Sequence, residues 1–255
     1  MRPYTRGFYE GQRDGSRASA QVIVPMLLEL VEVARVIDLG CGTGTWLSVF
    51  REHGVREVMG VDGPYVDRRL LAIPPECFVP FDLAQPFRAE ARYDLALSLE
   101  VAEHLPAKSA GSLVESLVGL APVVLFSAAV PGQGGHNHIN EQWPEYWAEL
   151  FEAHGCAVSD CIRPRVWRHP CVEPWYAQNL LLFCRVDQIE RHPALALEVA
   201  NTNAERLSLV HPGMFMRTCE QLSPENAPLG RLLRALPRAA ARAVATRIRR
   251  LRPPR

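Results

Sequence analysis

Short runs of β-forming apolar residues alternate with helical segments along this 255-residue chain, and this alternation limits the possible folds more than any other feature. Five such runs lie within the first 130 residues, and each is followed by a turn or a helix. Their ranges are Arg35–Leu39, Glu57–Val61, Cys77–Phe81, Tyr93–Leu99 and Val123–Val130. Strands that alternate with helices form mostly parallel sheets covered by helices on both faces. The pattern therefore predicts an α/β fold.

Two further strands, Ala157–Ile162 and Asn179–Val186, follow an aromatic amphipathic helix over residues 143–155. No helical pattern separates these two strands, which favours an antiparallel pair at one end of the sheet. With the five earlier runs, they complete a predicted sheet of seven strands.

Composition and cysteine usage indicate a soluble globular protein, with 48% hydrophobic and 22% charged residues. The seven cysteines are scattered and include no CxxC pair, which is typical of reduced thiols in the cytoplasm. The stretch MRPYTRGFYEGQRDG lacks the apolar core of a signal peptide, and the apolar run Leu117–Val130 is too short to cross a bilayer. We therefore expect a cytoplasmic protein.

The motif DLGCGTG (residues 38–44) lies where the first strand ends and a helix begins. Glycines allow the backbone to approach a ligand closely, and the start of a helix offers unpaired N–H groups. A dinucleotide fingerprint needs GxGxxG, but counting from Gly40 or Gly42 places Thr45 or Leu47 at the last glycine position. A phosphate-binding loop needs a GK[ST] ending, and no lysine is near. The motif therefore indicates a different kind of ligand loop.

Acidic residues also stand at the ends of the following strands: Asp62 in GVDG, Asp82 in FDL and Glu100 in SLEVAEHL. Ligands of open α/β sheets bind at the carboxyl ends of the strands, where these carboxylates would gather. Together with the glycine motif, this pattern resembles the class I S-adenosylmethionine-dependent methyltransferases over about residues 34–186. The resemblance implies a Rossmann-like fold and S-adenosylmethionine as the methyl donor. A sulfonium cation without phosphate suits an acidic, glycine-rich site.

The resemblance also implies roles for individual residues. The glycine loop would pass under the methionine part of the donor, and the acid that ends the second strand would bind both ribose hydroxyls. Asp82, the acid after the third strand, and the following backbone amide of Leu83 would meet the adenine, and the end of the fourth strand would line the methionine end. The implied donor-binding residues are Asp38, Gly40, Gly42, Gly44, Asp62, Gly63, Asp82, Leu83, Ser98 and Glu100.

Methyl transfer to oxygen or nitrogen needs an aligned nucleophile and usually the removal of a proton. The segment GGHNHINE, after the fifth strand, places His136 and His138 two residues apart, and in an extended chain they would point the same way. An imidazole is well matched to proton abstraction near neutral pH. We predict His138 as the base, with His136 as its alternative. Glu141 and Asn140 would orient the base or bind a polyhydroxyl acceptor.

Other interpretations of these residues stay open. His136, His138 and Glu141 have the ligand types of a zinc-like ion, but because all three lie in one short segment we expect no metal. Glu103 and His104 form a second acid–base candidate, for which a structural role at a helix start is the simpler interpretation. A further interpretation of the segment GGHNHINE is a structural loop without a role in catalysis or metal binding.

The stretch PGQGGHNHINEQWPEYW resembles a subgroup of bacterial methyltransferases associated with sugar or cell-surface polysaccharide modification. The resemblance therefore implies O-methylation of a sugar or other small hydroxylated acceptor. The alternatives are N-methylation of a small molecule or a protein, and a non-catalytic partner protein that only binds the cofactor. An oxidoreductase is a weaker alternative.

We expect three regions: residues 1–33 as a helix or lid, 34–186 as the donor-binding domain, and 187–255 as a helical extension. From residue 231 onward the chain has nine arginines and no acidic residue, which leaves 19 basic against 28 acidic residues, a net charge of −9, before it. This tail is either an anchor for a membrane surface or an anionic polymer, or a solvated or dimer-forming helix interrupted at Pro237. Nucleic acid is not an expected partner, because the tail lacks interleaved aromatic residues and the body is acidic.

Overall fold

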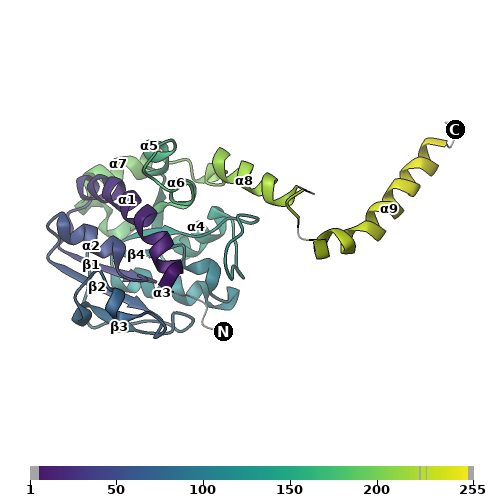
Figure 1. The fold of residues 1–255 in the computed structure, drawn as a ribbon. Helices are drawn as coiled ribbons and strands as arrows, with labels where there is room; N and C mark the ends of the chain where they lie inside the picture. The colour runs from purple at the N-terminus through teal and green to yellow at the C-terminus, as the bar shows by residue number, and fades with distance from the viewer. Residues whose placement is uncertain (1–5, 224, 228, 252–255) are drawn as a thin grey trace. The chain divides into compact units, whose positions relative to one another are not determined.

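The computed structural model describes residues 6–223, 225–227 and 229–251. Within these residues, seven strands form one sheet with the order β3-β2-β1-β4-β5-β7-β6 (Figure 1). The strands are β1 (Arg35–Leu39), β2 (Glu57–Asp62), β3 (Phe78–Pro80), β4 (Leu95–Leu99), β5 (Val123–Ser127), β6 (Cys156–Ser159) and β7 (Leu181–Arg185). Neighbouring strands from β3 through β5 are parallel, whereas β7 is antiparallel to β5 and β6. The predicted Rossmann-like, mostly parallel sheet with an antiparallel strand at one end is confirmed, and the reversed strand lies second from the edge.

The chain divides into two compact units, one ending at His211 and the other beginning at Pro212. Helices of the first unit are α1 (Arg6–Leu30), α2 (Thr45–Glu52), α3 (Ala110–Leu120), α4 (Pro144–Ala153), α5 (Arg163–Val166), α6 (Pro174–Asn179) and α7 (Pro193–Asn201). The second unit contains α8 (Pro212–Leu222) and α9 (Leu229–Leu251). None of the helices in the described part of the chain has the length and apolar character that a bilayer crossing requires.

Two expectations about helices were wrong. The short helices α5 and α6 stand between β6 and β7, where no helix was expected. Both have proline in their first turn, and helices of one or two turns are too short to produce a clear hydrophobic period. In the tail, α9 continues through Pro237 instead of stopping there.

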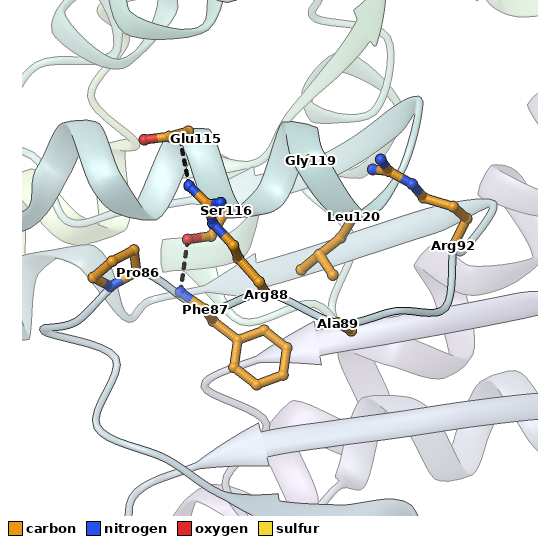
Figure 2. A pocket seen from close by; sticks show the side chains of 9 residues that line it. All are labelled: Pro86, Phe87, Arg88, Ala89, Arg92, Glu115, Ser116, Gly119 and Leu120. Atoms are coloured by element: carbon orange, nitrogen blue, oxygen red, sulfur yellow. Dashed lines mark hydrogen bonds and ion pairs between the residues drawn. The ribbon is translucent and has the colours of Figure 1, made fainter.

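Helices α3 and α4 contribute to the apolar core on one face of the sheet, against strand residues such as Ile37, Ala96 and Phe126. Segment 86–92 and the second half of α3 also line a pocket of about 320 Å³ (Figure 2). In this pocket the backbone N–H of Phe87 donates to Oγ of Ser116 at 3.0 Å. The pocket is not lined by any residue at the carboxyl end of a strand, where ligands of open α/β sheets bind. The candidate site therefore lies elsewhere.

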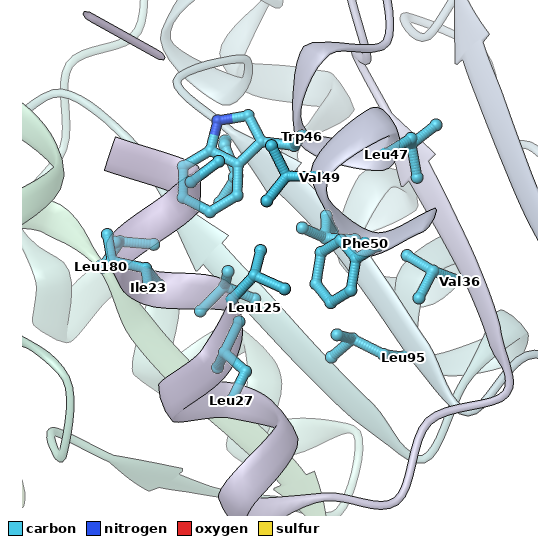
Figure 3. Packing of buried hydrophobic residues seen from close by; sticks show 14 of the residues in the cluster. Ile23, Leu27, Val36, Trp46, Leu47, Val49, Phe50, Leu95, Leu125 and Leu180 are labelled. Carbon is cyan, nitrogen blue, oxygen red and sulfur yellow. The ribbon is translucent and has the colours of Figure 1, made fainter. Parts of the chain in front are cut away.

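Helices α1 and α2 pack on the other face, as Figure 3 shows. Ile23 and Leu27 of α1 and Phe50 of α2 are fully buried there, together with Val36 and Leu95 of the sheet. Adjacent strand residues therefore face opposite cores, which is the period of two expected for strands buried on both sides. These two cores fix the strand ends on which the site is built.

Candidate active site

The loop between β1 and α2 carries the three glycines of the DLGCGTG motif. Gly40, Gly42 and Gly44 have φ angles of 95°, 54° and 79°, in the left-handed region that favours glycine. A Cβ atom added to Gly40 would lie 2.2 Å from Cγ2 of Val101, too close for any side chain. The loop therefore presents bare backbone at the carboxyl end of β1, directly before the first turn of α2.

Asp62, the last residue of β2, fastens this loop. Its Oδ2 accepts a hydrogen bond from the backbone N–H of Gly42 (2.7 Å). Its Oδ1 accepts from the N–H of Gly63 (2.6 Å) and from the hydroxyl of Tyr65 (2.8 Å). Burial raises the pKa of Asp62, and these hydrogen bonds partly offset the rise. The carboxylate is thereby held at the sheet edge, beside the glycine loop.

Two buried oxygens near the loop, Oδ1 of Asp38 and Oγ of Ser98, have no hydrogen-bond partner within the described part of the chain. Asp38 in β1 is paired with Leu97, the neighbour of Ser98 in β4. Burial, and then the charge of Asp62, raise the pKa of Asp38 to about 7. Leaving a buried polar atom unpaired costs about 1–3 kcal/mol, so a bound polar ligand would gain by supplying the missing partner.

Asp82 and Leu83 follow β3 on the adjoining part of the same edge. The backbone N–H of Phe81 donates to the carbonyl of Asp62 at 2.7 Å and joins this segment to the end of β2. Asp82 is exposed, and its Oδ1 accepts a hydrogen bond from the N–H of Ala84 at 3.0 Å. Leu83 is buried. The acid predicted after the third strand is thus next to Asp62 along the sheet edge.

Glu100 begins the loop after β4 with a φ angle of 55°, a left-handed conformation that costs an L-residue about 1–2 kcal/mol. Its backbone N–H donates to the carbonyl of Ser127 at 3.0 Å. Its carboxylate accepts hydrogen bonds from Nδ2 of Asn179 (3.0 Å) and Nε2 of Gln133 (3.1 Å). Burial raises the pKa of Glu100, which these bonds and nearby His138 partly reduce. Three separate segments therefore hold this strained residue in place.

Gln178 and Asn179 are site residues that the sequence did not indicate. They end α6 directly before β7, and the reversed direction of β7 brings this end of the helix to the carboxyl edge of the parallel strands. Nε2 of Gln178 donates to Oε1 of Gln133 at 3.0 Å and extends the network around Glu100. Since α6 itself was not predicted, no sequence signal placed these amides at the edge.

The histidine segment after β5 is a turn, and the expected extended conformation was wrong. Asn137 has a φ angle of 59°, which breaks the alternation that would make the two histidines face the same way. His136 is exposed, whereas His138 is half-buried with its Nδ1 3.0 Å from Oε1 of Glu141. The two Glu141 oxygens also accept from the N–H groups of Gly132 (2.8 Å) and Gly134 (2.9 Å). Glu141 therefore orients both the loop and one imidazole.

Glu103 and His104 lie beside His138. One ligand atom from each of the three side chains lies within 4.8 Å of the other two, and the two imidazole centroids are 4.9 Å apart, edge to face. The carbonyl of Glu103 accepts from the N–H groups of Ile139 (2.8 Å) and Asn140 (3.1 Å), which ties the histidine turn to this helical turn. Burial, and then the charge of Glu100, raise the pKa of Glu103 well above its usual value. Burial lowers the pKa of His104 to about 4.

The sequence model of the methyltransferase domain family matches residues 9–159. No curated protein is significantly similar in sequence. An O-methyltransferase family protein from Burkholderia thailandensis is 18% identical with a TM-score of 0.52, over 70% of this chain and 59% of that one, so this chain spans less than two thirds of its length.

Two further solved structures are similar. The small RNA methyltransferase HEN1 is 18% identical with a TM-score of 0.50, over 66% of this chain and 25% of that one. Magnesium protoporphyrin IX methyltransferase from Synechocystis PCC 6803 is 19% identical with a TM-score of 0.49, over 67% and 84% of the two chains. At 18% identity, the Burkholderia thailandensis and HEN1 structures support a shared fold and nothing finer.

Proposed function

Because this chain belongs to the methyltransferase domain family, and within it to the class I enzymes that use S-adenosylmethionine, we propose that it methylates a hydroxyl group of a sugar or another small acceptor. The paired His138 and Glu141 carry this proposal. A hydroxyl has to lose its proton during transfer, and an imidazole near the sheet edge is suited to accept it.

The residues at the edge fit the donor. Its cationic methionine end would lie near the unpaired oxygens of Asp38 and Ser98 and near Glu100, above the backbone of the glycine loop. Asp62, with Gly63, would bind the ribose hydroxyls, and Asp82, with the amide of Leu83, would meet the adenine. In this proposal residues 34–186 form the donor-binding domain, residues 1–33 the lid, and residues 187–255 an extension.

His138 would receive the proton. When bound, the donor supplies an electrophilic methyl group on a positively charged sulfur. Since Glu141 is placed to accept a hydrogen bond from Nδ1–H, the tautomer of His138 would leave a lone pair on Nε2. The acceptor oxygen forms a bond to the methyl carbon as the carbon–sulfur bond breaks, and its proton moves to Nε2. His136 is the weaker candidate because it is exposed.

The test compares His138→Ala with His154→Ala in a methyl-transfer assay on a panel of sugars and small alcohols. We expect His138→Ala to lower turnover by at least about 100-fold. The affinity for S-adenosylhomocysteine, measured by calorimetry, should stay within about twofold. His154, exposed after α4 and before β6, should keep full turnover. Parallel loss of cofactor binding in His138→Ala, or full turnover without this imidazole, would refute the base role.

The same assay separates the alternatives. An amine acceptor presents a lone pair without losing a proton first, so N-methylation should tolerate His138→Ala far better than O-methylation. A non-catalytic partner protein would bind S-adenosylhomocysteine but form no product with any acceptor in the panel.

For the tail, we propose attachment of α9 to an anionic membrane surface. Leu229, Leu233 and Leu236 lie on one side of this helix and are 57–70% exposed, and Arg234 and Arg238 lie on the other side. A basic helix with an exposed apolar face binds at the interface of anionic bilayers. The full chain should co-sediment with phosphatidylserine vesicles at low salt, and a chain lacking residues 229–255 should not. Binding to neutral phosphatidylcholine vesicles with equal strength would contradict the role of the arginines.

A further inference from the structure

The cluster of Glu103, His104 and His138 has an unexplained feature at its centre. Glu103 is fully buried, and among the residues that the structure describes neither of its carboxylate oxygens has a hydrogen bond of regular geometry. The backbone N–H groups of Glu103 and Ala129 lower its pKa, but less than burial raises it. Burying a carboxylate without partners is costly, and such groups in proteins are usually paired or coordinate a metal. The proposed methyl transfer through His138 gives this carboxylate no role.

The geometry around Glu103 is that of a ligand set. The carboxylate shares a space with two imidazoles, and the three ligand atoms lie within 4.8 Å of one another. Metal–ligand bonds of about 2.0–2.2 Å place the ligand atoms of a tetrahedral site about 3.3–3.6 Å apart, so rotations of the three side chains that bring their ligand atoms up to about 1.5 Å closer would close the set around an ion. The ligands come from two segments, the turn after β4 and the turn after β5.

The arrangement around the set also fits a metal site. Nδ1 of His138 contacts Glu141 at 3.0 Å, and a metal-binding histidine commonly donates its second ring N–H to such a carboxylate. Glu100, held by Asn179 and Gln133, is a second carboxyl group that interacts with Glu103. The turn that carries His138 is fixed to the turn of Glu103 by two backbone hydrogen bonds. The three side chains therefore do not have to find one another when an ion arrives.

We propose that Glu103, His104 and His138 bind one divalent first-row transition-metal ion, in the series from Mn²⁺ to Zn²⁺. Two imidazole nitrogens and one carboxylate suit these ions, whereas Mg²⁺ and Ca²⁺ prefer oxygen ligands alone. The inference shares His138 with the proposed function: in the metal-loaded protein this imidazole is a ligand, and in the metal-free protein it is free to accept a proton. Metal binding is measured without an acceptor, so the two proposals can fail separately.

The test is calorimetric titration of the metal-free full-length protein with MnCl₂. We expect one ion per chain, and at least about 100-fold weaker binding by Glu103→Gln, because loss of a supporting residue alone typically costs 10–100-fold. The matched control is His136→Ala, in the same turn but outside the cluster, which should bind Mn²⁺ as tightly as the wild type. No binding by the wild type, undiminished binding by Glu103→Gln, or equal loss in His136→Ala would each overturn the proposal.

A second measurement guards against misfolding of the buried Glu103→Gln variant. Each variant is titrated with S-adenosylhomocysteine, and unchanged affinity shows that the fold and donor site are intact. In addition, the visible absorption of bound Co²⁺ should appear in the wild type and disappear in His138→Ala, whose half-buried side chain lies in the turn between β5 and α4. Persistence of the Co²⁺ band in His138→Ala would place the ion elsewhere and refute the assignment.

Discussion

Replacing Gly40 by alanine tests whether the glycine loop needs its glycine for conformation, for space, or for both. Gly54, after α2, is a matched control: its φ angle is 91° against 95° for Gly40, but a Cβ atom there would meet nothing within 4 Å. Both substitutions force alanine into a left-handed conformation, at a cost of about 1–2 kcal/mol. Only Gly40→Ala also drives a methyl group to 2.2 Å from Cγ2 of Val101.

The difference between the two variants gives the magnitude of the steric effect. Inserting a methyl group into packed surroundings costs about 1–3 kcal/mol, so Gly40→Ala should lower the free energy of unfolding by about 2–5 kcal/mol. Gly54→Ala should lower it by about 1–2 kcal/mol. Denaturant unfolding measures both values. Calorimetry should show a weaker affinity for S-adenosylhomocysteine only in Gly40→Ala, because only this loop lies under the proposed donor.

A double-mutant cycle then isolates the contact. Val101→Ala removes both methyl groups that the new Cβ atom would strike. The loss of unfolding free energy in the double variant should therefore be smaller than the sum of the two single losses by about 1–3 kcal/mol. If Gly40→Ala costs no more than Gly54→Ala, or if the two substitutions are additive, the close approach of backbone and Val101 is not what requires glycine at this position.

Three further predictions concern the donor site and α3. Asp62→Ala should weaken S-adenosylhomocysteine binding by at least about 100-fold in calorimetry, since two hydrogen bonds to a charged group contribute about 1.5 kcal/mol or more each. The pKa of Asp38 is raised to about 7 from 3.8, so the neutral form favours folding, and stability is lost as pH rises from about 4 to 7. Asp38→Asn should remove up to about 4 kcal/mol of this pH dependence in denaturant unfolding, and an unchanged profile would contradict it. Gly119→Ala, in α3 with nothing within 4 Å of the added atom, should stabilise by about 0.5–1 kcal/mol, and a lower unfolding midpoint would disprove this.

The sequence predicted the parts of the fold that repeat a local pattern. The first strand and the motif DLGCGTG stand where they were expected, because apolar runs, glycines and strand-end acids are local signals. The family identified from these residues is confirmed by the match to residues 9–159. The turn at Asn137 was not predicted, because one left-handed residue inside a polar segment leaves no periodic trace.

The proximity of Glu103 to His138 could not be read from the sequence either. The two residues are 35 positions apart, and they meet because the loops after β4 and β5 leave neighbouring parallel strands at the same edge. The pairing of β4 with β5 was expected. The directions of the Glu103 and His138 side chains, however, depend on the turns that follow these two strands. For that reason the sequence favoured a structural role for Glu103.

The reversed strand β7 affects the site as well as the topology. In a fully parallel sheet, the residues directly before a strand lie at the amino edge, away from the ligand. Because β7 is antiparallel, Phe126 near the end of β5 pairs with Leu181 at the start of β7, and the end of α6 arrives at the carboxyl edge. Asn179 can then donate to Glu100, whose left-handed backbone needs such support. The antiparallel strand thus supplies side-chain amides that a parallel strand would place on the wrong side of the sheet.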